Sequence, residues 1–511
     1  MMKNFFAVCV VLLCGITEVY SQYYSTISDQ NTSNPFVLSY GVDSRMQLFV
    51  PDTGTQILFN PARAALFNRQ FVVGKYDGLS RYYSQPLPTM DIAVLRKDEN
   101  AFWMIQLTNT INSTISENEN NYEEIVPVPR KYYFKEKQIT ENNITKTRLK
   151  ISRIILKDAT SYSYSLYGSF LPNSLKQIYT YTDNFYNYTT TSKSTKNYFR
   201  NEDRRIKTPE YLLGTEIGIA NENSDFIFSG EYKVGKRELT YLNNNERSNF
   251  DSSASNFNSN YDKSLSSSSS TIDPTTIRAN IFYQYAVTMF GISTNNFVSI
   301  TTSVLSGNYI LDMKVTSFNK SQSGSNPVYG DTSIIESNGS VKGTNYDISV
   351  SFGSLIHIGF DELQIQTGVI PSIFYTKNID GITGSSYYSR SMLIKSEYQK
   401  YALDITLPFV VSYAPTEWCM FYSGMNVNYS FDKSDRKDKE LPLTRYFSSA
   451  NNSSSNYLEL GSNTSSTNYT SFSRFFLNMQ LQHRSGFKVQ LSFRENITQF
   501  GVWGVSMMYF F

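Results

Sequence analysis

The sequence predicts an all-β chain, a closed antiparallel transmembrane β-barrel of about 14 to 16 strands with an N-terminal hatch segment. Three observations support this fold class. Apolar and polar residues alternate along much of the second half, the connections between strands form a short class and a long class, and the chain ends on an aromatic strand. We expect a signal peptide at 1–21, a hatch or plug segment at 22–67 and the barrel with long extracellular loops at 68–511.

The N-terminus is typical of a secretory signal peptide. Lys3 precedes an apolar run from Phe5 to Ile16, and Ser21 ends a small-residue cleavage site. An apolar run of about 12 residues is too short to cross a hydrocarbon core, which needs about 20. We therefore expect cleavage after Ser21. A lipoprotein anchor at Cys14 is the alternative, and the large Leu13 before it disfavours that reading.

Composition excludes several protein classes. The mean hydropathy of the 511 residues is −0.35, and no later apolar run reaches the length of a transmembrane helix. The 39 Tyr and 35 Phe favour strands. Because 46 basic residues nearly balance 44 acidic ones, we expect no nucleic-acid partner. Cys419 is the only cysteine after the signal peptide, so a disulfide framework is excluded.

The clearest alternation lies between Asn345 and Phe360. One face of this predicted strand is mostly polar, and the other holds Tyr346, Ile348, Val350, Phe352, Ile356, Ile358 and Phe360. The pattern recurs over 403–413, 475–481 and 487–494. One side of these strands should therefore contact lipid or a core, and the other should contact water.

The connections between strands distinguish a barrel from a large soluble β-sandwich, whose strands also alternate. Short connections are predicted at 96–99, 158–160, 221–224, 291–296, 361–362, 414–416 and 484–485. Long loops rich in Asn, Ser, Lys and Glu are predicted near 110–147, 171–211, 235–276, 319–343, 377–400 and 432–472. Short periplasmic turns and long external loops are characteristic of bacterial outer-membrane barrels.

Two parts of the predicted barrel depart from simple alternation. Phe297–Phe318 is predicted as one long strand, and a β-bulge near Ser306-Gly307 would account for its change of parity. The low-complexity runs Ser248–Ser270 and Asn451–Thr470 are expected to have no regular structure.

The last strand carries a candidate assembly signal. Its predicted outward-facing residues are Trp503, Val505, Met507, Tyr509 and Phe511. The pattern resembles the C-terminal signal of outer-membrane barrels, which ends in an aromatic residue and has another two residues earlier. The resemblance implies recognition by the barrel-assembly machinery as the last strand pairs with the first.

A short motif precedes the first predicted strand. Pro61 suits the first turn of a short helix, Asn60 can cap it, and Ala62 allows close packing against a wall. Asn60-Pro61-Ala62 resembles the Asn-Pro-Ala segment of FadL-type outer-membrane transporters of hydrophobic compounds and of related barrels in Bacteroidetes-like bacteria. The resemblance implies that this segment belongs to a hatch inside the barrel.

Candidate enzyme motifs are weak. His483 and Ser485 have the His-x-Ser spacing of outer-membrane phospholipases, but they fall at a predicted periplasmic turn and lack the Asn-Gly that follows the serine in that family. His357 is expected among polar lumen residues, and Asp361-Glu362 is expected to be a solvated pair in a turn. No metal-binding spacing or phosphate-binding loop occurs, so we expect neither catalysis nor a cofactor.

Two functions remain open. The first is passive transport of small hydrophobic or amphipathic compounds through a barrel closed by a hatch. The second is a secretion-system or surface scaffold without transport, which long external loops would equally suit. The expected location is the bacterial outer membrane, with the short turns and the C-terminus in the periplasm. The expected partners are membrane lipids, the barrel-assembly machinery, and a small hydrophobic ligand or secreted proteins.

Overall fold

The computed structural model describes residues 53–68, 70–77, 89–98, 101–126, 130–188, 192–253, 257–289, 292–323, 329–360, 362–382, 386–387, 390–391, 394–440, 445–447, 461–494 and 501–510. The predicted signal peptide, residues 22–52 of the predicted hatch, and Phe511 lie outside these described residues.

Two short helices precede a series of long strands. The helices are α2 (Thr53–Phe59) and α3 (Arg63–Phe67). The strands are β1 (Phe71–Asp77), β2 (Thr89–Asp98), β3 (Ala101–Val126), β4 (Arg130–Lys157), β5 (Thr160–Tyr188), β6 (Ser192–Ala220), β7 (Ser224–Gly235), β8 (Arg237–Ser253), β9 (Phe257–Met289), β10 (Ile292–Ser323), β11 (Tyr329–Phe360), β12 (Leu363–Ile382), β13 (Ser386–Tyr387), β14 (Arg390–Ser391), β15 (Ile394–Thr416), β16 (Cys419–Glu440), β17 (Arg445–Phe447), β18 (Gly461–Gln482), β19 (Phe487–Arg494) and β20 (Gly501–Phe510).

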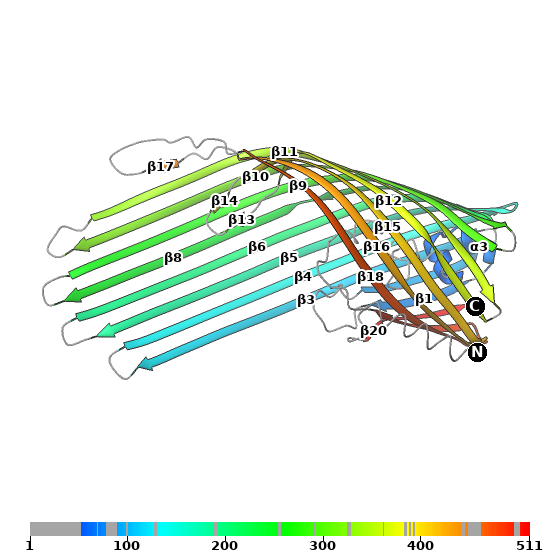
Figure 1. Ribbon diagram of the computed structural model, residues 1–511, viewed down its shortest axis with the longest axis horizontal. Helices are drawn as coiled ribbons and strands as arrows, with labels where there is room; N and C mark the ends of the chain where they lie inside the picture. Colours follow the sequence, from blue (N-terminus) through cyan, green and yellow to red (C-terminus); the bar gives the residue numbers. More distant parts are fainter. Residues whose placement is uncertain are drawn as a thin grey trace.

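The strands close into an antiparallel barrel. Each wall strand pairs with the next along the chain, and β20 pairs with β1, where Phe510 lies opposite Phe71. β7 and β8 share one position in the wall, because both lie between β6 and β9. The wall therefore has 16 strands. The predicted closed antiparallel barrel is confirmed (Figure 1).

A belt of exposed apolar side chains surrounds the barrel. On β6, Tyr211, Leu213 and Ile217 point outward, and 39–58% of each side chain is exposed. From Tyr211 to Ile219 the strand runs about 27 Å, or about 20 Å along the barrel axis when tilted. Aromatic residues lie at the two ends of such stretches, including Tyr211, stacked on Phe170, and Trp418 in a short turn. This belt has the height and the aromatic borders of a membrane-spanning surface.

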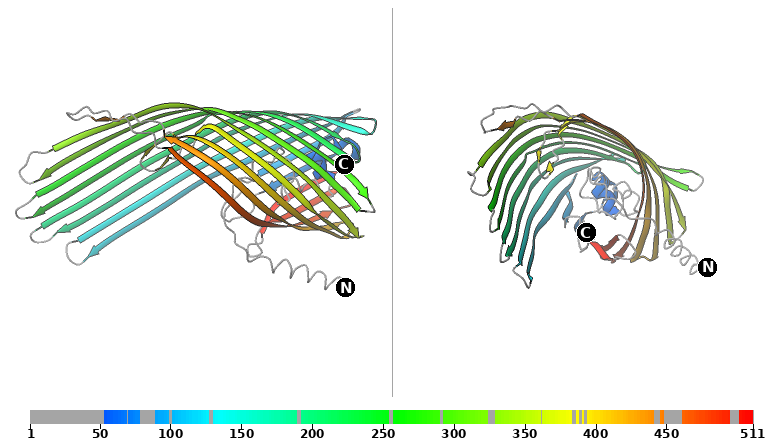
Figure 2. Two further views of the ribbon diagram at one scale, coloured as in Figure 1. Left: turned by 45° about the horizontal axis from the view of Figure 1, so that its top comes forward. Right: turned by 60° about the vertical axis from the view of Figure 1, so that its left-hand side comes forward.

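The predicted long loops are the main error of the sequence-based prediction. Residues 110–126, 130–147, 171–188, 192–211, 237–253, 257–276 and 305–343 largely continue the strands, and β3–β6 and β8–β11 extend far beyond the apolar belt as one curved sheet (Figures 1 and 2). We call this sheet the extension. The run Ser248–Ser270 lies mostly in its strands β8 and β9, so the prediction of no regular structure there is also wrong. Residues 432–440 and 461–472 are likewise strand, in β16 and β18.

Strand lengths show how far the extension projects. The 32 residues of β10 span about 110 Å along the strand, or about 75 Å along the axis at a tilt of about 45°. A hydrophobic band of about 25 Å accounts for only a third of this height. Most of the extension therefore lies outside the membrane.

The short connections lie at one rim, as predicted. Strands run alternately up and down the wall, so the turns after β2, β4, β6, β9, β11, β15 and β18 share one end of the barrel. The turns after β4, β6, β11 and β18 are where the sequence placed them. β2 continues to Asp98, and β10 begins at Ile292, so those connections are shorter than predicted.

Two local predictions are wrong. Pro415 lies in β15, and the turn follows at 417–418, because a register irregularity between Tyr413 and Thr416 accommodates the proline at the end of the strand. The predicted bulge at Ser306-Gly307 does not occur, since the pairing of β10 with both neighbours continues through these residues without a shift. The parity of apolar residues changes there because both faces of the extension meet water.

Candidate functional site

The Asn60-Pro61-Ala62 motif joins two helices that pack against the inner wall. The N–H of Arg63 and that of Ala64 donate to the carbonyl oxygens of Asn60 and Pro61, both at 3.0 Å. The side-chain oxygen of Asn60 accepts from the N–H of Ala62 at 3.2 Å. The structure therefore places Pro61 in the turn that opens α3, and Asn60 caps this turn rather than the first helical residue.

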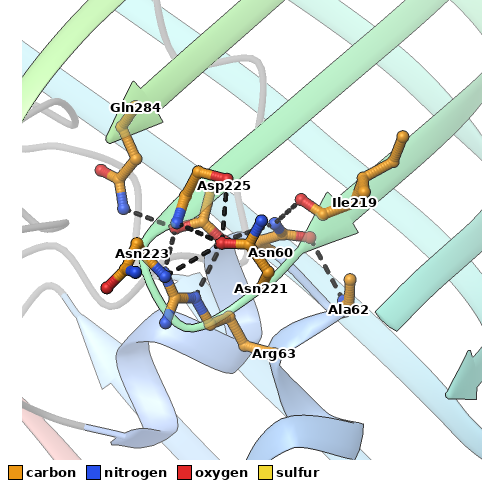
Figure 3. A network of polar contacts seen from close by, with 9 residues as sticks. Asn60, Ala62, Arg63, Ile219, Asn221, Asn223, Asp225 and Gln284 are labelled. Atoms are coloured by element: carbon orange, nitrogen blue, oxygen red, sulfur yellow. Dashed lines mark hydrogen bonds and ion pairs between the residues drawn. The ribbon is translucent and has the colours of Figure 1, made fainter. Parts of the chain in front are cut away.

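A buried carboxylate on the wall binds the motif. Asp225 accepts from Nδ2 of Asn60 at 2.9 Å and from Nε and Nη2 of Arg63 at 2.8 and 2.6 Å. Gln284 on β9 donates to the same carboxylate at 2.5 Å (Figure 3). We call Asn60, Arg63, Asp225 and Gln284 the Asp225 latch. Because Asp225 is only 3% exposed and Arg63 14%, removing one partner of such a pair should cost about 3–5 kcal/mol.

The turn before β7 fixes the position of Asp225. The side-chain oxygen of Asn221 accepts from the backbone N–H of Asn223 at 2.9 Å and from that of Ser224 at 2.7 Å. These bonds form an Asx-type turn, which sets where β7 starts. Nδ2 of Asn60 also donates to the carbonyl oxygen of Ile219 at 3.2 Å, on the strand before this turn. The helices are therefore tied to both strands of one hairpin.

An apolar layer surrounds the latch. Ile57 and Leu58 of α2 and Ala64 and Ala65 of α3 are buried in one cluster with wall residues from β1–β4, β7, β9–β12, β15, β16 and β20. Phe59 meets Phe282 edge to face, with ring centroids 5.3 Å apart. We call this layer the apolar seal. It lies at the end of the barrel that carries the short turns, where Figure 2 shows the two helices enclosed by the wall.

Above the seal, one side of the lumen is charged. Lys150 and Glu216 form a buried ion pair of 2.6 Å. Arg148 lies 3.5 Å from Glu231 and 4.3 Å over the ring of Tyr167. The hydroxyl of Tyr167 donates to Glu231 at 2.9 Å, and its ring covers a glycine of β6, Gly214. The interior therefore changes from apolar at the seal to polar above it, which suits molecules that carry both kinds of surface.

Sequence reasoning missed the wall residues of this site. Asp225 follows a correctly predicted turn, so its parity on β7 could have placed it in the lumen. Lys150 and Glu216 lie in β4 and β6, and the consecutive apolar residues Ile154 to Leu156 interrupt the alternation that would have shown which face of β4 lines the lumen. Their pairing across β5 depends on strand register, which one sequence does not specify.

The C-terminal strand has the predicted orientation where its side chains are described. Met507 and Tyr509 point outward, with 53% and 45% exposure, and Met508 between them is buried. Trp503 and Val505 lie in the same strand, and Phe511 lies outside the described residues. The last strand pairs with the first, as the assembly signal requires, but recognition by the assembly machinery stays a prediction.

The candidate histidines have structural contacts. Nδ1 of His483 lies 2.8 Å from Oγ of Ser485 and accepts from the N–H of that serine at 3.2 Å, so the pair closes the turn between β18 and β19. His357 contacts Asn295 in the lumen at 3.0 Å. Within the described part of the chain, no group of acidic, histidine or cysteine side chains could hold a metal ion. None of the described helices is long and apolar enough to cross a membrane.

Comparisons with known proteins add little to the geometry. No protein-family model matches the chain, and no curated protein matches it. Similar solved structures include the ferric yersiniabactin uptake receptor FyuA from Yersinia pestis, 7% identical with a TM-score of 0.21, covering 87% of this chain and 80% of that one. The siderophore receptor PirA from Pseudomonas aeruginosa is 8% identical, with a TM-score of 0.22 and coverage of 87% and 80%. The FrpB iron transporter from Neisseria meningitidis is 9% identical, with a TM-score of 0.22 and coverage of 92% and 84%.

Strand pairing and the apolar belt define the class of this protein. It is a 16-stranded β-barrel of the bacterial outer membrane. TM-scores this low carry no inference about its activity, and its resemblance to the FadL-type transporters stays a prediction.

Proposed function

We propose that the protein transports small hydrophobic or amphipathic compounds passively across the outer membrane, through a barrel closed by an N-terminal hatch. The observation that carries this proposal is the attachment of α2 and α3 to the inner wall by the Asp225 latch and the apolar seal. A barrel of 16 strands is wide enough for an aqueous channel unless something fills it. The helices supply such a filling.

The composition of the interior supports an amphipathic substrate. A compound that leaves the charged wall around Lys150 and Glu216 would next meet Phe282 and Phe297, whose rings stack with centroids 6.0 Å apart. Hydrophobic surfaces on the compound would replace contacts with the hatch, and its polar end would remain beside polar wall residues. Passage then requires displacement of the hatch and no chemical energy.

The Asp225 latch allows a direct test. In Asp225→Ala, Arg63 loses its ion pair and Asn60 loses an acceptor, so the hatch should leave the wall and single-channel conductance in planar bilayers should rise. The matched control is Asp347→Ala on β11, because Asp347 accepts from Ser303 at 3.2 Å and has no hydrogen bond to the described residues of α2 and α3. Conductance that stays at the wild-type level in both variants would contradict the proposal.

A second measurement tests the class of compound that the barrel transports. Liposomes that contain the protein should take up oleate faster than empty liposomes, and Asp225→Ala should accelerate this uptake further. Glucose serves as the polar comparison. Uptake of glucose but not of oleate would be consistent with a barrel closed by the hatch and would contradict a hydrophobic substrate.

A scaffold role is the second candidate, because the extension presents a large surface outside the membrane. A barrel that only anchors this surface would show no uptake of either compound. Secreted partners would instead remain bound to it through purification after mild crosslinking in cells.

A further inference from the structure

We propose that the concave face of the extension binds neutral polysaccharide. The inference rests on side chains far from the hatch and does not depend on transport. The pairing of β5 with β6 runs without a shift from Ser161 opposite Ala220 to Tyr188 opposite Lys193, so alternate residues keep the same side along the whole length. The face that lines the lumen therefore continues as the concave face of the extension (Figure 2).

Aromatic rings gather on this concave face. Phe134 of β4 meets Tyr181 of β5 with centroids 5.2 Å apart, and Tyr181 meets Tyr198 of β6 at 5.5 Å. Tyr179 adds a ring 6.4 Å from that of Tyr181. We call these four residues the aromatic ridge. Flat rings with polar edges suit the C–H faces and hydroxyl groups of sugar rings, which carry both kinds of surface.

Next to the ridge lie three asparagine side chains of β8. The buried side-chain oxygens of Asn243, Asn245 and Asn249 accept no hydrogen bond from the described residues. Asn243 is only 7% exposed, and it lies opposite Glu202 of β6 on the concave side. A buried acceptor without a donor costs about 1–3 kcal/mol, so a ligand that supplies hydroxyl donors would relieve this cost.

Arg200, a cation at the centre of the face, is paired with a carboxylate and is therefore better suited to a neutral ligand than to an acidic one. Arg200 and Glu202 form an ion pair, and the hydroxyl of Tyr181 lies 3.4 Å from a carboxylate oxygen of Asp183. Burial, followed by the neighbouring Glu136, raises the pKa of Tyr179 to about 12. Burial, followed by Glu202, also raises the pKa of Tyr241 to about 12. These hydroxyls therefore stay protonated at neutral pH.

Cross-strand stabilisation alone would also favour aromatic pairs in a sheet that meets water on both faces. That explanation does not account for Asn243, whose side chain is only 7% exposed and whose oxygen accepts no hydrogen bond from the described residues. A polysaccharide would contact both features, because its sugar rings stack on the aromatic rings and its hydroxyl groups donate hydrogen bonds to the amide oxygens. Adjacent Ser264, Ser266 and Ser268 of β9, opposite Asn245, Asn243 and Tyr241, would continue the polar surface.

The test uses the full-length protein in nanodiscs, with binding to dextran, mannan and galactan measured by biolayer interferometry. Alginate is the acidic comparison. We expect at least one neutral polysaccharide to bind. Tyr181→Ala should weaken binding about tenfold, Asn243→Ala about fivefold, and Tyr181→Phe less than twofold, because the phenylalanine keeps the ring face. Heat modifiability verifies that each variant is folded.

The matched control is Tyr133→Ala, since Tyr133 precedes Phe134 and faces the opposite side of the same strand. It should bind as the wild type does. Absence of binding to all neutral polysaccharides would overturn the proposal. Equal losses in Tyr133→Ala and Tyr181→Ala, or binding to alginate alone, would overturn it as well.

Discussion

At the scale of single residues, the fit between the predicted hatch and the wall depends on small side chains. A Cβ at Gly218 would lie 2.4 Å from the side-chain oxygen of Asn60 and from Oγ of Ser163. Ala62 and Ala64 are fully buried on the other side of the contact. The sequence suggested close packing by Ala62, but the complementary glycine on β6 becomes apparent only with the strand register.

Gly218→Ala should therefore loosen the hatch. The added methyl group would push Asn60 away from Asp225, so the N-terminal segment should become more sensitive to limited proteolysis. Gly230→Ala is the control, because its Cβ would meet nothing within 4 Å. Equal digestion of both variants and the wild type would show that contact with Gly218 does not hold the hatch.

At the scale of elements, period-two hydropathy predicted strands only where one face meets lipid. The strand around Tyr346–Phe360 was recognised because water and lipid lie on opposite sides. Residues 111–126 of β3 carry Asn, Ser and Glu on both faces, so they resembled a loop although their backbone pairs with β4 throughout. The residues on each face of a strand reflect whether that face contacts lipid or water. Outside the membrane both faces contact water, so composition no longer distinguishes a strand from a loop.

Ion pairs across the β3–β4 hairpin give it a pH dependence. Glu117, Glu119 and Glu123 pair with Lys137, Lys135 and Lys131 at 2.5, 3.0 and 2.7 Å. A hydrogen bond from Asn121, and then the bond from Lys135, lower the pKa of Glu119 from its ordinary 4.5. Its contribution to stability is therefore complete above pH 4.5 and is lost as the pH falls through the lowered value.

Amide hydrogen exchange in this hairpin, corrected for intrinsic rates, should accelerate as the pH falls through the lowered pKa of Glu119. Glu119→Gln should remove part of this dependence, since the amide does not titrate. A hairpin whose corrected exchange is the same at pH 3 and pH 6 would show that these pairs add no stability.

The last strand has an expected role in assembly. Deletion of Phe511 should lower the amount of protein in the outer membrane more than it lowers the stability of protein that has already folded. The comparison needs surface levels in cells and urea unfolding of the purified barrel. Unchanged surface levels after the deletion would leave Phe511 as a packing residue only.

At the scale of the whole molecule, the barrel and its asymmetry were predictable, whereas the extension and the lumen contacts were not. The barrel closes because every strand in lipid needs a hydrogen-bonded neighbour on each side. The positions of the short turns in the sequence show which strand ends share a rim. The latch joins residues 162 and 165 positions apart, and no local pattern records such contacts.

We expect the extension to lie outside the cell and the rim of short turns to lie in the periplasm. In a Cys419→Ser background, Ile115→Cys on the extension should react in intact cells with a polyethylene-glycol maleimide too large for porins. Trp418→Cys, in a short turn, should react only after the outer membrane is permeabilised. The side chains of Ile115 and Trp418 are 75% and 59% exposed, so the result depends only on which side of the membrane the reagent reaches. The reverse labelling pattern would show that the extension faces the periplasm.

The most direct test of the hatch is its removal. β1 starts at Phe71, so deletion of Gln22 to Leu66 with retention of the predicted signal peptide leaves all described strands of the closed wall. We expect an assembled, heat-modifiable barrel whose small-solute conductance exceeds that of the wild type, because a barrel of this size is open unless it is filled. Failure to assemble would assign the segment a role in building the wall, and normal assembly with unchanged conductance would contradict the hatch and favour the scaffold.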